Sequence, residues 1–423
     1  MRTAKDSGFE WIGAIPISWK LYKGKYMFAQ RNLRGNNIEL QLLSPTQKFG
    51  VVPQSVYEEL SGMNAVKLNE NTNLSALKTI HKGDFCISLR SFQGGFEYSE
   101  YEGVVSPAYQ VFYPIINVSR GYYKYLFKEC GFIEKMNSYT MTLRDGKNIA
   151  FADFGNTYIP CPPVDEQRRI SDFLDTKCAE IDALTADIQT QIDTLEQYKR
   201  SVITETVTKG LNPDVDMKNS GIEWVGAIPV HWSIHPVYTY FGERKNKNSF
   251  GREDNLLSLS HGRVIRKDIN TSDGLLPESF NTYNIVEAGD IIIRPTDLQN
   301  DKRSLRTGLV KEHGIITSAY IDLCPLKQVD SRYFHFLLHA YDVMKVFYNM
   351  GNGVRQGLNY SEFSRLMVFE PPYEEQVAMA DYLETKVAEV DAIIEQKKKQ
   401  MAVLDAYKRS LIFEYVTGKK EVI

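Results

Sequence analysis

The chain has 423 residues and a formal net charge of −3, with 43% hydrophobic and 24% charged residues. This composition is that of an ordinary globular chain, and the length predicts two or more domains. No apolar run approaches the roughly 18 residues of a membrane span, and residues 1–6 lack an apolar signal core, so we expect a cytoplasmic protein. The five cysteines are scattered without paired spacing, which favours neither a disulfide framework nor a zinc site.

Charge is distributed unevenly along the chain. Residues 1–161 carry a net charge of +4 and residues 162–214 carry −5, whereas 215–370 are neutral and 371–423 carry −2. The globular parts therefore hold relatively more base than the segments that follow them. This pattern is compatible with local phosphate-binding faces and does not by itself establish them.

A tryptophan-containing motif opens each half of the chain. Gly8, Trp11, Gly13 and Pro16 belong to the segment KDSGFEWIGAIP, which returns 213 residues later as KNSGIEWVGAIP at residues 218–229. A further tryptophan follows each copy at the same spacing. The chain is thus two half-chains of nearly equal length.

The regions that follow the two motifs also resemble each other. Gly83-Asp84 and Gly289-Asp290 are turn-then-strand signals, and helices are expected at 121–137 and 331–350. We predict a mixed α/β domain in each half, at 1–161 and 215–370, with a shared scaffold and diverged loops.

A second repeat, at an offset of 209, covers residues 162–214 and 371–423. Each copy starts with Pro-Pro-x-x-Glu-Gln and then contains no Gly or Pro until its last turn, which predicts one long helix. Apolar residues recur every seven positions, which indicates a coiled-coil seam whose obvious partner is the other copy. We expect Lys177, Lys386, Gln191 and Gln400 to interrupt the seam and fix its register. The predicted seam and its companion positions are Leu174, Ile181, Leu184, Ile188, Leu195, Tyr198, Leu383, Val390, Ile393, Leu404, Tyr407 and Leu411.

No catalytic or metal site is predicted. Glu370-Pro371-Pro372-Tyr373 is similar to the base-binding motif of amino-methyltransferases, but its repeat, beginning at Cys161, lacks the carboxylate and the ring, and no Gly-rich cofactor loop follows a strand. The double proline is better explained as a stop before the long helix. His335 and His339 lie one helical turn apart without a third ligand in view, so packing roles are favoured over zinc.

Predicted loop tips gather basic and polar side chains of the kinds that contact bases and phosphates. A solvated loop is the alternative for each of them. The candidate DNA-contacting residues are Lys48, Arg90, Gln93, Arg144 and Lys147 in the first domain, and His261, Arg263, Arg294, Gln299, Lys302, Arg303, Arg306, Asn352, Arg355 and Gln356 in the second.

The two domains, each opened by Gly-x-x-Trp-x-Gly-x-Ile-Pro-x-x-Trp and closed by Pro-Pro-x-x-Glu-Gln plus a long helix, resemble the specificity subunit of type I restriction–modification systems. The resemblance covers essentially the whole chain. It implies an α+β fold in which two target-recognition domains, 1–161 and 215–370, are separated by two conserved spacer helices, 162–214 and 371–423, packed as an antiparallel coiled coil with pseudo-twofold symmetry.

The resemblance also implies a function. Each domain would read one half of a split, asymmetric site in double-stranded DNA, and the helices would set the unread gap and bind two methyltransferase subunits. Restriction subunits would join that core. S-adenosylmethionine, ATP and Mg²⁺ are then expected on the partner subunits, with no cofactor, metal or catalytic residue on this chain.

Two other classes of protein remain as alternatives. A stand-alone methyltransferase or nuclease would carry a further catalytic domain, and no segment is left to hold one. A coiled-coil adaptor with globular ends that bind proteins is consistent with the neutral second domain, and salt-dependent DNA binding would distinguish it from a DNA reader.

Overall fold

The structure is a computed structural model that describes residues 3–34, 40–63, 74–87, 95–139, 149–270, 279–296, 298, 305–346, 348, 350 and 357–422. The chain divides into two compact units, one formed by Met1–Ile188 with Lys399–Ile423 and the other by Gln189–Lys398. Each unit holds one globular domain and part of each long helix. Within the described ranges, no helix is both long and apolar enough to cross a membrane.

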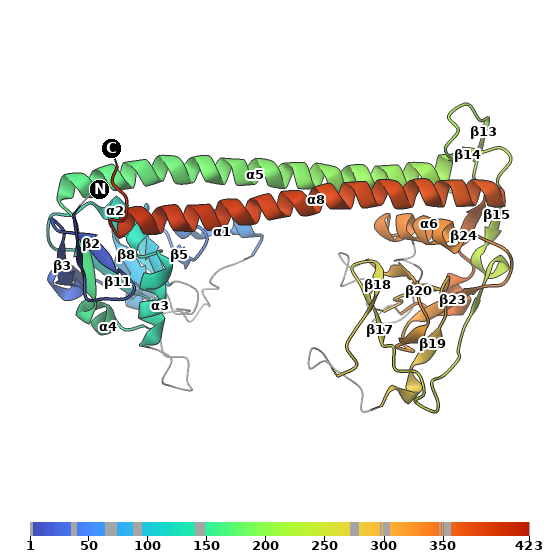
Figure 1. The fold of residues 1–423 in the computed structure, drawn as a ribbon, viewed down its shortest axis with the longest axis horizontal. Helices are drawn as coiled ribbons and strands as arrows, with labels where there is room; N and C mark the ends of the chain where they lie inside the picture. The colour runs from blue at the N-terminus through green and yellow to red at the C-terminus, as the bar shows by residue number, and fades with distance from the viewer. Residues whose placement is uncertain are drawn as a thin grey trace. The chain divides into compact units, whose positions relative to one another are not determined.

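The first globular domain contains twelve short strands and four helices among its described residues (Figure 1). Its strands are β1 (Ala4–Asp6), β2 (Ala14–Pro16), β3 (Lys20–Lys23), β4 (Phe28–Arg31), β5 (Leu43–Thr46), β6 (Gly50–Pro53), β7 (Lys78–Ile80), β8 (Phe85–Ile87), β9 (Phe96–Tyr98), β10 (Gly103–Val105), β11 (Gln110–Pro114) and β12 (Tyr158–Cys161). Its helices are α1 (Gln54–Ser61), α2 (Arg120–Leu126), α3 (Cys130–Ser138) and α4 (Phe151–Asn156).

The second globular domain repeats this plan without a counterpart of α1 in its described part. Its strands are β13 (Met217–Asn219), β14 (Ala227–Pro229), β15 (Ser233–Pro236), β16 (Phe241–Glu243), β17 (Leu257–Ser260), β18 (Arg263–Arg266), β19 (Asn284–Val286), β20 (Ile291–Ile293), β21 (Thr307–Leu309), β22 (Gly314–Ile316), β23 (Ile321–Pro325) and β24 (Met367–Glu370). Its helices are α6 (Ser331–Val343) and α7 (Tyr360–Phe363).

A four-stranded antiparallel sheet forms the centre of each domain. Its strand order is β4-β11-β8-β9 in the first domain and β16-β23-β20-β21 in the second. In each sheet an arginine at the end of the edge strand binds the aspartate that precedes a central strand. Arg31 Nε lies 2.6 Å from Asp84 Oδ2, and Arg244 Nε lies 2.8 Å from Asp290 Oδ2. The Gly-Asp pairs noted in the sequence therefore supply the aspartate of an ion pair that both domains share.

The two long helices are α5 (Val164–Lys209) and α8 (Tyr373–Val416), each starting directly after its double proline. They run antiparallel within each unit. In the first unit the rings of Phe173 and Tyr415 pack in a tilted arrangement with centroids 4.5 Å apart, and Asp182, further along α5, forms an ion pair with Lys408. In the second unit, Lys199 likewise meets Asp391. The α+β architecture and the antiparallel coiled coil predicted from the sequence are confirmed.

The second row of the coiled-coil seam differs from the prediction. The predicted companions Leu184, Tyr198, Ile393 and Tyr407 are exposed, with 43% to 55% of their surface accessible. The residues that accompany the heptad row lie four positions after it rather than three, and they include polar side chains: Cys178, Thr185, Ile192 and Lys199 on α5, and Val387, Ile394, Met401 and Lys408 on α8. A heptad pattern of apolar residues does not include this row, because the row contains threonine and lysine.

The predicted polar interruptions of the seam are also wrong. Lys177 and Lys386 point outward, where each binds a glutamate three residues ahead at 2.8 Å, and Gln191 and Gln400 are exposed. Lys199 and Lys408 are the lysines that enter the seam at equivalent positions of the repeat.

The buried glutamine of each Pro-Pro-x-x-Glu-Gln segment explains why the motif recurs. Gln376 Nε2 donates to the carbonyl of Pro371 (2.9 Å), and its Oε1 accepts from the backbone N–H of Asp330 (3.0 Å). Gln167 makes the same two contacts, with Pro162 and Ser119, at 2.8 Å each. One side chain thus joins the start of a long helix to the start of a domain helix.

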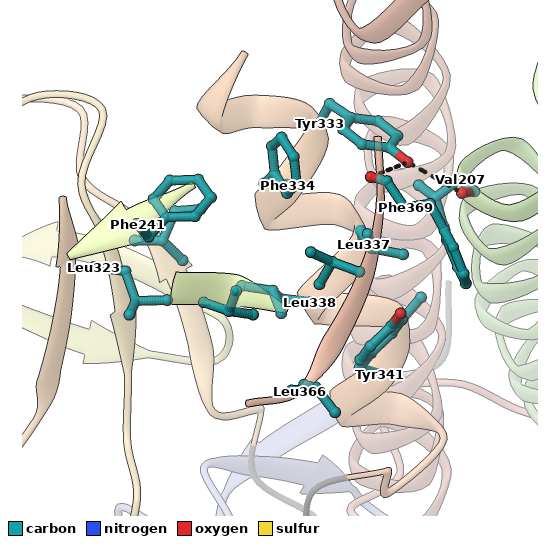
Figure 2. Packing of buried hydrophobic residues seen from close by; sticks show 14 of the residues in the cluster. Val207, Phe241, Leu323, Tyr333, Phe334, Leu337, Leu338, Tyr341, Leu366 and Phe369 are labelled. Atoms are coloured by element: carbon teal, nitrogen blue, oxygen red, sulfur yellow. Dashed lines mark hydrogen bonds between the residues drawn. The ribbon is translucent and has the colours of Figure 1, made fainter. Parts of the chain in front are cut away.

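Each hydrophobic core includes residues from both long helices. In the second unit Tyr333 of α6 directs its hydroxyl to the carbonyls of Val207 and Phe369, while Phe334 packs toward Phe241 on the sheet side (Figure 2). The repeat counterpart, Tyr122, donates to the carbonyl of Val416 at 2.6 Å. Neither globular domain completes its core without the coiled coil.

The two predicted domain helices are shorter than expected. The helix predicted at 121–137 is divided into α2 and α3, because Glu129 accepts from the backbone N–H groups of Gly131 and Phe132 at 2.8 Å and starts a new helix. The helix predicted at 331–350 ends as α6 at Val343, and Lys345 adopts a positive φ of 61°.

Candidate nucleic-acid interface

In the first domain, the described residues that flank segments 88–94 and 140–148 lie at the same end of the central sheet. Segment 88–94 follows Ile87 at the end of β8, and Gln110 pairs with Ile87 at the start of β11. The Gln110 amide donates to the carbonyl of Ile149 (2.8 Å) and accepts from the N–H of Phe151 (2.7 Å), which holds these two residues at this end of the sheet. Arg90, Gln93, Arg144 and Lys147 themselves lie outside the described residues.

The second domain brings its corresponding segments together in another way. Segment 297–304 lies between Arg294 and Arg306, whose backbones are joined by an N–H···O bond of 2.8 Å. The N–H of Leu358, just after segment 351–356, donates to the carbonyl of Pro295 at 3.0 Å. The described residues that flank both segments therefore lie beside the end of β20. Gln299, Lys302, Arg303, Asn352, Arg355 and Gln356 lie outside the described residues.

A hairpin contributes a further candidate surface in each domain. Lys48 is exposed in the β5–β6 turn, with its ammonium 5.1 Å from the centre of the Phe49 ring. In the β17–β18 turn His261 and Gly262 both have positive φ, 48° and 75°, which is typical of the two-residue turn that suits strand twist. Arg263, the next residue, forms an ion pair with Asp391 of α8.

Arg306 was predicted to contact DNA, but the structure places its side chain in the interior of the second domain. Its side chain is fully buried, its Nε donates to the hydroxyl of Tyr348 at 2.9 Å, and its Nη1 donates to the carbonyl of Thr296. Its backbone N–H donates to the buried carboxylate of Asp342. The residue therefore holds the base of segment 297–304 from inside and does not present its guanidinium to DNA in this structure. Arg294 is half-buried at the same place.

An exposed aromatic–arginine pair was missed in the sequence. Phe250 is 81% exposed in the segment between β16 and β17, and the guanidinium of Arg252 lies 5.1 Å from its ring centre. Aromatic rings of this kind stack on nucleic-acid bases, and arginine contributes a cation–π contact. The available signal was the basic, asparagine-rich run from residue 244 to 252, in which Phe250 is the lone apolar side chain.

Two features that resemble catalytic sites have structural roles. The Glu370 carboxylate accepts from Lys327 Nζ (2.9 Å), Tyr240 Oη (3.0 Å) and Ser233 Oγ (3.1 Å). Burial lowers the pKa of His335 to about 3 and that of His339 to about 4, so both rings are neutral near pH 7. The described residues contain no cluster of three or more side chains suited to holding a metal ion.

Comparison with known proteins gives a consistent family. Residues 20–194 match the model of the type I restriction modification DNA specificity domain. The chain is 24% identical over 270 residues to the putative type I restriction enzyme MjaX specificity subunit of Methanocaldococcus jannaschii, covering 62% of this chain and 59% of that protein. It is also 24% identical over 310 residues to the MjaVIII specificity subunit of the same organism, covering 67% and 68% of the two chains.

The chain is similar to the specificity subunits of type I restriction enzymes, and its residues 20–194 match the DNA specificity domain of type I restriction modification. The chain spans 59% of the length of the first of these relatives.

Solved structures share the fold of this chain. A chain from a study of complex assembly and conformational transition in a type I R-M system superposes with a TM-score of 0.68, covering 96% of this chain and 99% of that chain at 14% identity. The HsdS subunit of Thermoanaerobacter tengcongensis gives a TM-score of 0.50, with coverage of 96% and 98% and the same identity.

Proposed function

We propose that this chain reads a bipartite, asymmetric DNA site through its two globular domains. The observation that carries the proposal concerns the described residues that flank the diverged segments, 88–94 with 140–148 and 297–304 with 351–356. In both domains these flanking residues lie at the same end of a central strand of the duplicated sheet. A common scaffold with different loops is suited to reading two different half-sites. Direct reading would come from Lys48, His261 and the loop residues, with Phe250 and Arg252 as a stacking pair.

The long helices would serve as spacer and scaffold. A helix rises about 1.5 Å per residue, so the length of the coiled coil would set the unread gap between the half-sites. Major-groove readers on one face of DNA lie about one helical turn apart, or a multiple of it. We also propose that the protein is cytoplasmic, where it would have access to DNA.

Exposed apolar residues on the coiled coil support binding of two copies of one partner. Leu184 and Tyr407 are exposed in the first unit, and their repeat counterparts Ile393 and Tyr198 are exposed in the second. The antiparallel register places the members of each pair near each other, because Asp182 meets Lys408 and Lys199 meets Asp391. We assign these two patches to two methyltransferase subunits, which would carry S-adenosylmethionine, with restriction subunits that use ATP and Mg²⁺ joining the assembly.

Co-expression with the methyltransferase subunit, followed by genome-wide sequencing of modified bases, tests the recognition role. We expect methylated adenines in a split motif with a fixed gap, and we expect exchange of residues 1–161 to change one half of that motif only. A stable complex without methylation would favour the protein-binding adaptor. Methylation by this chain alone would refute the proposal.

Native mass spectrometry tests the scaffold role. The double substitution Leu184→Glu with Tyr407→Glu is expected to convert a complex with two methyltransferase subunits into a complex with one, and Tyr198→Glu with Ile393→Glu should do the same. Val403→Glu is the matched control, because Val403 is exposed on α8 but its repeat counterpart is Thr194. An unchanged stoichiometry in both double variants would contradict the assignment of the patches.

A further inference from the structure

The β17–β18 hairpin of the second domain is tied to the spacer helix by charge. The guanidinium of Arg263 binds Oδ2 of Asp391 on α8, and the other oxygen of that carboxylate accepts from Lys199 Nζ on α5 at 2.8 Å. Lys199 also lies 2.8 Å from Glu196. Asp391 is 27% exposed and Arg263 is 70% exposed, so the network starts inside the coiled coil and ends at the hairpin surface.

The other side of the hairpin is packed against the sheet. A Cβ added at Gly262 would lie 2.9 Å from Cδ1 of Leu305, and one added at Gly308 in β21 would lie 2.5 Å from Cδ1 of Leu259. Contacts this close leave no room for a side chain at either glycine. The hairpin, whose turn carries His261, therefore lies between β21 and α8 and contacts both.

This ion pair is a second electrostatic attachment of the domain along α8. The first lies near the start of the helix, where Arg332 of α6 binds Asp381 (2.7 Å) and Glu384 (3.0 Å). Asp391 follows Asp381 by ten residues, which corresponds to about 15 Å along the helix axis. A body that is attached at two separated points resists pivoting about either of them.

The first unit has the same carboxylate but a different hairpin. Asp182 is the repeat counterpart of Asp391, and Lys408, its partner, is the counterpart of Lys199. In the β5–β6 hairpin Gly50 pairs with Thr46, and in the β17–β18 hairpin Arg263 pairs with Ser260. Gly50 therefore occupies the position that corresponds to Arg263 and has no side chain that could bind Asp182. In the described part of the first unit no hairpin cation reaches Asp182. Arg263 is thus an addition to an ion pair that both repeats share.

We propose that Arg263 is a positioning residue that fixes the second recognition domain on α8 and thereby narrows the range of spacer lengths that the protein accepts. This inference rests on the proposed reading of a split DNA site. It assigns to Arg263 a role that acts through Asp391, instead of the direct base contact expected from its place in the sequence.

The test uses the full chain co-expressed with its methyltransferase subunit. Plasmids carry the native split site with the gap unchanged, shortened by one base pair or lengthened by one base pair, and methylation of each is measured. Asp391→Asn and Arg263→Ala are expected to reduce the preference for the native gap about two- to five-fold, the range that corresponds to losing one largely exposed ion pair. The sequences of both half-sites should remain unchanged, and Arg263→Lys should restore most of the preference.

Asp182→Asn is the matched control, because it removes the equivalent carboxylate where no hairpin arginine is attached, and it should leave the gap preference as in the unaltered protein. An equal loss of methylation at all three gaps in Asp391→Asn, or the same change in Asp182→Asn, would overturn the inference. The inference would also be overturned if Arg263→Ala changed the sequence of the second half-site while Asp391→Asn left the gap preference unaltered. That result would make Arg263 a direct DNA contact. If the unaltered protein directs no split-site methylation, the proposed function itself fails.

Discussion

Lys408 of α8 donates to both carboxylate oxygens of Asp182 on α5, at 2.6 and 2.7 Å, and their repeat counterparts Lys199 and Asp391 form the same pair at 2.8 Å. One ion pair is therefore used twice, once in each unit. Both lysines enter the row of side chains between the helices. Because a slip of one helix by a turn would separate both pairs, they fix the antiparallel register.

We expect the two pairs to differ in strength because they differ in exposure. Lys199 and Asp391 are 18% and 27% exposed, whereas Asp182 is 63% exposed. Lys199→Met should lower the free energy of unfolding by about 1 kcal/mol, and Lys408→Met by less. Urea unfolding at low and high salt measures both. A larger effect for Lys408→Met, or no salt dependence for either, would contradict this ranking.

Gln376→Leu should destabilise the second unit. The substitution leaves the buried N–H of Asp330 and the carbonyl of Pro371 without the amide that joins them. Each unsatisfied buried group costs about 1–3 kcal/mol. Thermal unfolding of this variant and of Gln167→Leu measures the loss. Both substitutions should destabilise the protein to a similar extent, because the two glutamines make the same contacts. An unchanged stability in either variant would show that packing of the leucine side chain replaces the two hydrogen bonds of the glutamine amide.

Arg306→Met should lower stability far more than a substitution at a DNA contact would. It removes the buried guanidinium that bonds Tyr348 and Thr296 beside the buried carboxylate of Asp342. Breaking a buried charged network of this kind costs about 3–5 kcal/mol. Chemical unfolding measures the loss, and exposed Lys48→Met should stay within about 0.5 kcal/mol. If Arg306→Met unfolded like the parent protein but lost DNA binding, Arg306 would be a reader after all.

Asp322 should make stability depend on pH in the neutral range. Burial, and then the nearby charge of Asp290, raise the pKa of Asp322 to about 8. An unfolded aspartate has a pKa of about 3.9, so between these values the folded state holds a proton that the unfolded state has released. Its stabilising effect is therefore fully present below about pH 4 and is lost as the pH rises through 8.

Asp322→Asn tests this assignment, because the amide imitates the protonated acid at every pH. The variant should gain on the order of 5 kcal/mol over the parent protein near pH 9, and should show a flatter dependence of stability on pH between 4 and 8. Urea unfolding across this range is the measurement. The first domain shows that an uncharged side chain fits this position of the sheet, because Val111 of β11 corresponds to Asp322. A parent protein whose stability rises from pH 5 to 8 in step with the variant would contradict the raised pKa.

Insertion of seven residues into both long helices should lengthen the recognised gap. Seven residues add about 10 Å of helix, which corresponds to about three base pairs of DNA. The insertions belong after Thr190 and Lys399, which are repeat counterparts. Sequencing of methylated sites reads the new gap directly. The same insertion in α5 alone should instead disturb the register and destabilise the protein; an unchanged gap in the double insertion would refute the spacer role.

The sequence by itself determined the duplicated plan of this protein. Repeats at offsets of 213 and 209, a seven-residue apolar period and the absence of Gly and Pro within the long segments are local patterns, and they fix helix positions and the number of domains without knowledge of any contact. The resemblance to type I specificity subunits rests on the same local information.

Only the tertiary structure decided which side chains carry each role. Arg306 and Arg263 look alike as basic loop residues, yet one is enclosed beside Asp342 and the other pairs with Asp391, more than a hundred residues away. The second row of the coiled coil falls on Thr185 and Lys199, because packing follows helix geometry and tolerates polar side chains that find partners. Burial and charge pairing depend on residues that are distant in the chain, and no local pattern records them.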